Sequence, residues 1–281
     1  IWQYTSREPQ LPDFEPQMGD LGIFVGKIKS RSVSDSYEFL KSSGAELLSG
    51  IEKDPQGKSH FFVKDPWGNH FQVVEGNTWF RKENKWTGGP SGAILGVSDI
   101  EKSLGVYRDI LGYDTVVYDK TGSFEDLKGL PNGEAEVRRV LLRHSKPRSG
   151  AFSKLLGPSE IELVSLVSGG GRKIFENRYW GDRGFIHLCF DIVGMDALRK
   201  ECEAKGYPFT VDSADSFDMG EAAGHFTYIE DADGTLIEFV ETHKVPIMKK
   251  WGWYLNLKKR DARKPLPDWV IKAMRFAKPK N

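Results

Sequence analysis

Two residues near the end of the chain have the chemistry of metal ligands and lie in separate strand-like segments. His187 lies in G-F-I-H-L-C-F-D (184–191), whose side chains alternate with the period of two that is typical of a β-strand. Glu238 lies in L-I-E-F-V-E (236–241), which follows a tight-turn sequence at 232–235. Imidazole and carboxylate groups both bind divalent metals. A metal site is therefore the first hypothesis for this part of the chain.

The segment between these strands predicts how they are connected. Residues 194–205 carry small and apolar side chains at helical spacing, and Gly206 and Pro208 then favour the end of the helix. We therefore expect one strand–helix–strands unit that contains both His187 and Glu238.

The same unit occurs earlier in the chain. The turn D-P-W-G-N (65–69) matches D-A-D-G-T (231–235), and seven residues beyond each aspartate stand Gln72 and Glu238. One strand position thus carries an amide in one copy and a carboxylate in the other.

A third copy lies between these two. It begins with a predicted strand at 92–97, followed by a capping box from Ser98 to Glu101 and a helix that ends at Gly112. A strand that contains Glu162 closes this copy.

Composition excludes several classes of protein. The chain has 281 residues with 40 Lys and Arg against 40 Asp and Glu, so its overall charge does not favour nucleic acid as a partner. No apolar run approaches the roughly 20 residues of a membrane span, and we expect no signal peptide. Cys189 and Cys202 are too few for a disulfide framework and fit a reducing compartment. We predict a cytoplasmic protein with a small-molecule substrate and neither a nucleic-acid nor a membrane partner.

These segments resemble the vicinal oxygen chelate superfamily, which includes glyoxalase I, methylmalonyl-CoA epimerase, extradiol dioxygenases and bleomycin-resistance proteins. The matching phrases are L-G-V-S-D-I-E-K-S-L-G-V-Y-R-D-I-L-G-Y (95–113), G-F-I-H-L-C-F-D (184–191), D-P-W-G-N (65–69) and D-G-T-L-I-E-F-V-E (233–241). The resemblance implies an α+β fold of repeated β-α-β-β-β modules that pair into curved, cup-like mixed sheets. In that family two modules enclose a divalent metal, with ligands from the first and last strands of each.

The resemblance also implies how the chain is divided. Because I-W-Q-Y resembles the end of a last strand, residues 1–5 are expected to lie within a sheet. The expected parts are residues 1–9 as the remnant last strand of a truncated first module, 19–78 as the second module, 91–168 as the third, 183–243 as the fourth, which pairs with the third around the metal, and 244–281 as a basic, aromatic tail.

Carried over by position, the resemblance implies a metal site made by His187, Glu238 and Glu162. The remaining first-strand position is Gly92, which has no side chain and would leave space for water or substrate. One histidine and two carboxylates suit a single Zn²⁺, Ni²⁺, Mn²⁺ or Fe²⁺ ion, and Mg²⁺ is also compatible.

The metal-ligand assignment has one alternative, and the equivalent positions of the second module do not carry metal ligands. Glu160 shares a face with Glu162 and would replace it if the register shifted by two residues. In the second module the corresponding positions are at about Gly22 and Gln72, which implies a pair without metal.

The implied activity is that of a glyoxalase-type isomerase or lyase, which acts on a small oxygen-rich substrate through a metal-bound enediolate. Glu162 is the expected catalytic base, because the empty position at Gly92 would leave it loosely bound, whereas His187 and Glu238 would be firm ligands. Tyr228 is the second catalytic candidate, because it stands where extradiol enzymes often keep a tyrosine that contacts substrate. A tyrosine is also common there for packing alone.

Two other functions remain open at this stage. An extradiol ring-cleaving dioxygenase needs two histidines and one carboxylate on iron, and the glycine at position 92 counts against it. A non-catalytic small-molecule binding protein of the bleomycin-resistance type would not use the metal positions at all.

The other potentially reactive residues have simpler interpretations. Cys189 shares a face with His187 and is expected to be a small apolar residue in the cavity wall. Four histidines without recognisable partners are expected at the surface: His60, His70, His144 and His243.

The tail at 244–281 lies outside the repeat and is strongly basic. Its aromatic residues predict a face that packs on the modules, and 268–274 predicts a short helix after Pro267. Packing on the chain's own acidic surface, or across a homodimer, is favoured over a nucleic-acid or membrane-surface role.

Overall fold

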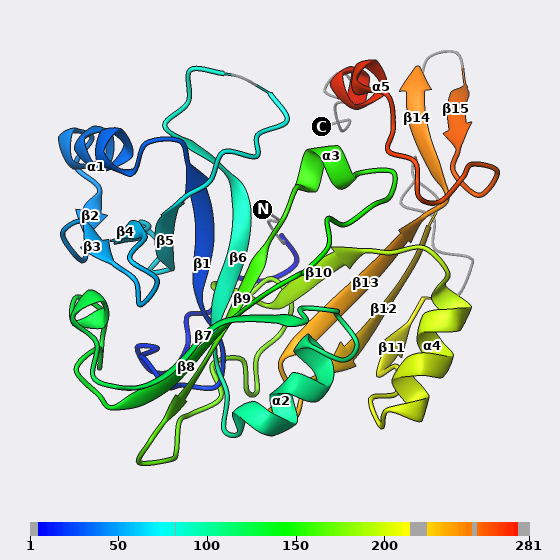
Figure 1. The fold of residues 1–281 in the computed structure, drawn as a ribbon. Helices are drawn as coiled ribbons and strands as arrows, with labels where there is room; N and C mark the ends of the chain where they lie inside the picture. The colour runs from blue at the N-terminus through cyan, green and yellow to red at the C-terminus, as the bar shows by residue number, and fades with distance from the viewer. Residues whose placement is uncertain (1–4, 82, 214–223, 249–251, 275–281) are drawn as a thin grey trace. The chain divides into compact units, whose positions relative to one another are not determined.

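The computed structural model describes residues 5–81, 83–213, 224–248 and 252–274. The chain divides into two compact units, each with its own sheet (Figure 1). The first unit comprises residues 1–145, 158–186 and 232–235, and the second comprises 146–157, 187–231 and 236–281.

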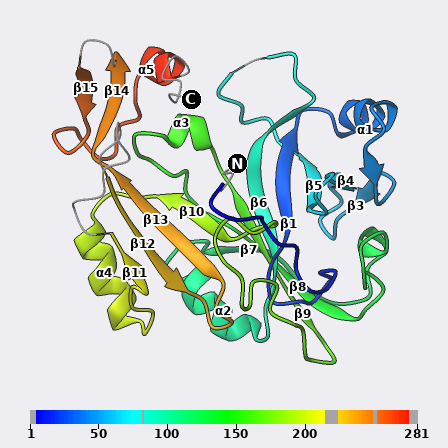
Figure 2. The same cartoon turned by 180° about the vertical axis from the view of Figure 1, so that it is seen from behind.

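The first unit is built on a nine-stranded mixed sheet, seen from both sides in Figures 1 and 2. Its strands follow the order β2-β4-β5-β1-β6-β9-β8-β7, with β3 paired to β4. The strands are β1 (Gly22–Ser30), β2 (Glu46–Leu47), β3 (Glu52–Lys53), β4 (Ser59–Lys64), β5 (His70–Glu75), β6 (Thr87–Gly96), β7 (Thr115–Gly122), β8 (Val137–Arg143) and β9 (Glu160–Leu166). The described helices of this unit are α1 (Val33–Ser42), α2 (Ile100–Tyr107) and the 3-10 helix η1 (Glu125–Leu127).

The second unit contains a four-stranded sheet in the order β10-β13-β12-β11, followed by a separate β14–β15 hairpin. Its elements are α3 (Ser153–Leu156), β10 (His187–Asp191), α4 (Met195–Ala204), β11 (Val211–Asp212), β12 (Gly224–Glu230), β13 (Leu236–Thr242), β14 (Lys244–Met248), β15 (Trp253–Asn256) and α5 (Asp268–Ala273).

The predicted repeat is present in the strand pairing. In each of three modules the first strand lies parallel to the last: β1 to β5, β6 to β9 and β10 to β13. The remaining pairs within the modules are antiparallel, so every module contributes a mixed sheet. This confirms the predicted α+β fold of repeated β-α-β-β-β modules.

Strand hydrogen bonds join the second module to the third. Strand β1 of the second module pairs antiparallel with β6 of the third, with Lys27 opposite Gly92. The first strand of the third module therefore lies between its own last strand and the second module. The fourth module forms a sheet of its own, so the pairing of the third with the fourth has no support in the strand hydrogen bonds of the described residues.

Apolar residues of both joined modules make the core of the first unit. Val25 and Ile94 from the two central strands pack with Phe62, Leu127 and Val137, and all five side chains are at most 3% exposed. A smaller cluster under α1 joins that helix to β4 and β5. Because Phe61 and Phe62 point to opposite faces of β4, the two clusters lie on opposite faces of the sheet. Burial of the larger cluster stabilises the second and third modules as one body.

The start of α2 departs from the predicted capping box. Its N-cap is Asp99, whose carboxylate accepts a hydrogen bond from the Lys102 amide at 3.2 Å. The Ser98 hydroxyl instead donates to Asp233 at 2.5 Å, in the turn before β13. Either residue type can cap a helix, and the long-range contact of Ser98 decides which one does so here.

The predicted elements at the two ends of the chain have different outcomes. Residues 1–4 of the expected N-terminal strand lie outside the described residues, and Thr5 is not part of a strand. The helix predicted at 268–274 is present as α5. Lys154 pairs with Asp268 at 2.7 Å, and the Leu266 amide donates to Ala151 at 2.8 Å, so this end of the tail packs within its own unit.

The aromatic face predicted for the tail is present only in part. Trp253 of β15 is 52% exposed, and Trp251 lies outside the described residues.

Across the described part of the chain, no helix is both long and apolar enough to cross a bilayer.

Candidate functional site

Strands β10 and β13 bring His187 and Glu238 together in the second unit. The two strands are parallel neighbours, with His187 opposite Leu236 and Cys189 opposite Glu238. His187 Nε2 lies 3.0 Å from Glu238 Oε2, and the two side chains are 24% and 17% exposed. The structure therefore places the two predicted metal ligands side by side and leaves them partly accessible.

Tyr228 completes this group from the other side of Glu238. It lies opposite Glu238 on the antiparallel strand β12, and its hydroxyl donates to Glu238 Oε1 at 2.7 Å. Its ring meets the His187 ring edge to face, with centroids 5.4 Å apart. Three predicted site residues, His187, Tyr228 and Glu238, thus form one contiguous cluster.

Local electrostatics keep Glu238 ionised. Partial burial by itself would raise the pKa of Glu238, but hydrogen bonds from His187, Tyr228 and Cys189 outweigh this effect and hold the pKa below its usual range. The Cys189 thiol responds in the opposite sense, because desolvation and the Glu238 carboxylate raise its pKa. Cys189 is therefore a neutral thiol at physiological pH and is not prepared for nucleophilic attack.

Glu162 lies in the first unit and has other partners. Its carboxylate is 1% exposed, accepts a hydrogen bond from Lys27 Nζ at 2.9 Å, and accepts two more from Arg139 Nε at 2.8 Å and the Tyr118 hydroxyl at 2.9 Å. Burial opposes ionisation, but Arg139 and Lys27 outweigh it, so the pKa of Glu162 is strongly lowered. This is not the loosely held base that the empty position at Gly92 led us to expect.

The second carboxylate on this strand is engaged in the same way. Glu160 accepts hydrogen bonds from Lys27 at 2.9 Å and from Arg143 at 2.6 Å. The alternative in which Glu160 takes the place of Glu162 would therefore exchange one carboxylate that is already ion-paired for another. Lys27 lies between both acids. The sequence analysis did not predict this role, although a lysine within the apolar run 21–28 indicates a buried partner.

Gly92 has a structural explanation that differs from the expected one. A Cβ atom added at this position would lie 1.8 Å from the Glu160 carbonyl oxygen on the neighbouring strand, and the φ angle of Gly92 is +152°. The glycine therefore permits close contact between β6 and β9 and does not open space for water or substrate.

Two of the four histidines expected at the surface are buried instead. His60 is 1% exposed and lies 3.6 Å from Asp126, which in turn pairs with Arg139 at 2.8 Å. His70 is 3% exposed and packs against Phe24. Both histidines lie on strands, where successive side chains point to opposite faces, and both fall on the inner face. The apolar residues around them in the sequence already indicated burial.

Comparison with known proteins assigns the family. The model of the Glyoxalase/Bleomycin resistance protein/Dioxygenase superfamily matches residues 91–239, slightly more than half of the chain. The chain belongs to this superfamily. No curated protein matches it.

Solved structures show the same fold at low sequence identity. A putative dioxygenase from Bacillus subtilis subsp. subtilis str. 168 is 16% identical with a TM-score of 0.54, and the match covers 80% of this chain and 63% of that one. Glyoxalase I from Zea mays is 15% identical with a TM-score of 0.50, with 80% and 69% covered. This chain therefore spans about two thirds of the length of either protein.

Proposed function

We propose that this protein is a divalent-metal-dependent isomerase or lyase that acts on a small oxygen-rich substrate, with His187 and Glu238 as metal ligands. The observation that carries the proposal is an imidazole and a carboxylate 3.0 Å apart, on the first and last strands of a module within the superfamily match. Such a nitrogen and oxygen donor set suits Zn²⁺, Ni²⁺, Mn²⁺ or Fe²⁺. A metal bound there would polarise a substrate carbonyl.

The pair fits two positions of a metal centre. Ligand atoms at about 2.0–2.2 Å from one ion lie about 3 Å from each other, which is the separation of His187 Nε2 and Glu238 Oε2. Within the described ranges, no group of three His, Cys, Asp or Glu side chains is arranged to hold a metal ion. His187 and Glu238 would therefore be two of the ligands, and the other positions would belong to water, substrate or further groups.

Tyr228 would act as a positioning residue. Its hydroxyl donates to Oε1 of Glu238, which leaves Oε2 on the side of His187. A hydrogen bond to the outer oxygen of a ligating carboxylate fixes the orientation of that ligand and supports metal affinity. We do not include Glu162 among the ligands, because both of its oxygens already accept hydrogen bonds, from Lys27, Arg139 and Tyr118.

Metal analysis of matched variants tests the proposal. We expect the wild type to retain one divalent ion per chain after loading and dialysis, and His187→Ala and Glu238→Ala to lose it. Tyr228→Phe should bind metal roughly 10-fold to 100-fold more weakly, because only the hydrogen bond is removed. His144→Gln is the matched control, since that histidine lies in the first unit and contacts Leu111. Equal metal content in the wild type, His187→Ala and Glu238→Ala would refute the assignment.

The reaction class has its own test. An isomerase or lyase of this kind removes a proton from carbon next to a carbonyl group. We expect the metal-loaded protein in deuterium oxide to exchange that proton in a member of a panel of α-hydroxy aldehydes and ketones, as followed by proton NMR. The exchange should disappear in Glu238→Ala, whereas exchange that persists in this variant would place the activity elsewhere.

A further inference from the structure

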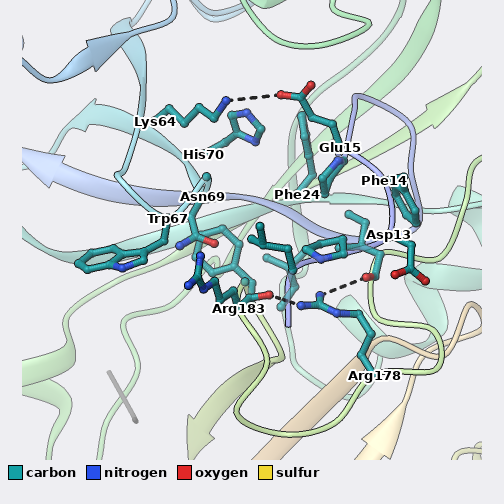
Figure 3. A pocket seen from close by; sticks show the side chains of 18 residues that line it. Asp13, Phe14, Glu15, Phe24, Lys64, Trp67, Asn69, His70, Arg178 and Arg183 are labelled. Atoms are coloured by element: carbon teal, nitrogen blue, oxygen red, sulfur yellow. Dashed lines mark hydrogen bonds and ion pairs between the residues drawn. The ribbon is translucent and has the colours of Figure 1, made fainter. Parts of the chain in front are cut away.

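A cavity of about 400 Å³ lies within the first unit (Figure 3), and its lining includes neither Glu162 nor the partners of Glu162. Its walls come from three parts of the chain that are distant in sequence: residues 11–16, the turn at 67–70, and residues between 174 and 185. Strand β1 closes it with Ile23 and Phe24. All of the lining belongs to the same compact unit, so the cavity is a feature of that unit alone.

The body of the cavity is apolar and aromatic. Phe24 is 3% exposed and Ile174 5%, and Phe185 is held edge to face against Phe71 with ring centroids 5.4 Å apart. Trp67 lies at the rim and is 57% exposed, although a large apolar side chain is normally covered. Aromatic walls of this kind favour a flat apolar group.

Polar groups with unused hydrogen-bonding capacity face this apolar body. His70 is 97% buried, and its Nε2 atom has no hydrogen-bond partner among the described residues. The buried Nε of Arg178 also lacks a partner there, whereas its terminal nitrogens donate to the carbonyl oxygens of Ile174, Gln10 and Arg183. A buried donor without a partner is costly, so a ligand that supplied an acceptor would be stabilised.

The charges around the cavity favour an anion. Lys64, Arg178 and Arg183 line it against two acids, Asp13 and Glu15. Glu15 already pairs with Lys64 at 3.5 Å. Arg183 is exposed, and its guanidinium has no ion pair or hydrogen bond in the part of the chain that the structure describes. One cation is therefore available to a ligand, in addition to the Arg178 donor.

We propose that this cavity binds a small aromatic carboxylate, with its ring among Phe24, Phe185 and Trp67 and its carboxylate toward Arg183 and the Nε of Arg178. The volume is at the lower end of the range of small-molecule sites, which suits a one-ring or two-ring acid. Inorganic anions would leave the aromatic walls unused, and a cationic ligand would face excess positive charge. The proposal is independent of His187 and Glu238.

Calorimetric titration of the whole chain tests the proposal with three probes. Indole-3-acetate supplies ring and charge, indole-3-acetamide supplies the ring without charge, and acetate supplies charge without the ring. We expect saturable one-to-one binding of indole-3-acetate, at least about tenfold weaker binding of the amide, and no binding of acetate. A charge-assisted hydrogen bond of about 1.5–3 kcal/mol corresponds to at least this ratio.

Variants of exposed residues locate the binding without threatening the fold. Arg183→Gln should weaken indole-3-acetate binding about tenfold or more, and Trp67→Ala should weaken it severalfold. Arg148→Gln, at an exposed arginine in the second unit, and His187→Ala should both leave it unchanged. The proposal would be overturned by no saturable binding at millimolar concentration, by equal affinity for acid and amide, or by wild-type affinity in Arg183→Gln.

Discussion

Lys27 illustrates how one residue changes the interpretation of two others. Its ammonium group donates to Glu160 and Glu162, both at 2.9 Å, and is 2% exposed. Arg139 approaches Glu162 from the other side at 2.8 Å and extends the network to Asp126. The predicted metal ligand Glu162 and its alternative Glu160 are thus both neutralised by the protein's own cations. A buried network of this kind depends on each member, because loss of one leaves an uncompensated charge.

Removal of the Lys27 ammonium should therefore destabilise the first unit. We expect Lys27→Met to lower the free energy of unfolding by about 3–5 kcal/mol, since two buried carboxylates lose a shared partner. Chemical denaturation at neutral pH would measure this. Lys128→Met removes an equivalent charge from an exposed pair with Glu125 and should change little. A similar, small effect of both substitutions would show that the network does not stabilise the fold.

Asp191, at the end of β10, predicts a dependence of stability on pH. Desolvation and the neighbouring Glu241 raise its pKa from 3.8 to about 6. The folded state therefore binds this proton more tightly than the unfolded state, so the contribution of Asp191 to stability is greatest below about pH 4 and is lost as the pH rises through 6. Asp191→Asn should raise the free energy of unfolding by about 2 kcal/mol at pH 7.5 and have little effect at pH 4.

The measurement is denaturant unfolding of wild type and variant at several values of pH. Asp261→Asn, at an exposed aspartate, is the control and should show no such difference between the two pH values. Equal stabilisation by Asp191→Asn at pH 4 and pH 7.5 would contradict an electrostatic origin.

At the scale of elements, the close contact between β6 and β9 explains Gly92 and supports a further prediction. A side chain there would meet the Glu160 carbonyl and would also need a strained positive φ angle. Gly92→Ala should therefore destabilise the protein by about 2–4 kcal/mol. Gly89 on the same strand has no atom within 4 Å of a built Cβ, so Gly89→Ala is the matched control and should stay within about 0.5 kcal/mol. Thermal unfolding of the two variants, Gly92→Ala and Gly89→Ala, measures the difference. Equal melting temperatures would contradict this explanation of Gly92.

The local part of the fold could be predicted from the sequence, because it depends on short-range patterns. Period-two alternation around His187 and the stop signals at Gly206 and Pro208 identified β10 and α4. The cluster of His187, Tyr228 and Glu238 was likewise accessible, because its members belong to one module with a recognisable repeat. Contacts between modules carry no such signal. Lys27 and Glu162 are 135 residues apart, and the sequence of neither strand identifies the other as its partner.

At the scale of the whole molecule, the two compact units have different chemical character. In the first unit the inner face of the joined second and third modules contains lysine, arginine and carboxylates that satisfy one another. In the second unit His187 and Glu238 are partly exposed, and Tyr228 and Cys189 also hydrogen-bond to the Glu238 carboxylate. The fourth module thus carries His187 and Glu238 on its first and last strands, whereas Glu162, at the last-strand position of the third module, pairs with Lys27 and Arg139.

This division predicts that catechols are not substrates for oxygen-dependent ring cleavage. Mononuclear iron oxygenases of the facial-triad class use two histidines and one carboxylate. Here His187 is the imidazole beside Glu238, and the corresponding first-strand position of the third module is Gly92. Among the other described histidines, His225 contacts Asp212 and His243 lies 3.6 Å from Glu241, so neither is paired with Glu238. The remaining three, His60, His70 and His144, belong to the first unit. Iron-loaded protein with a panel of catechols should therefore consume oxygen no faster than His187→Ala, as measured with an oxygen electrode.

The outcome of that experiment separates two reaction classes of one superfamily. Proton exchange without oxygen uptake would support the isomerase or lyase, because both reactions use polarisation of the substrate but only ring cleavage consumes oxygen. Catechol-dependent uptake that disappears in Glu238→Ala would instead mean that a second imidazole reaches the pair, and the protein would then be a dioxygenase.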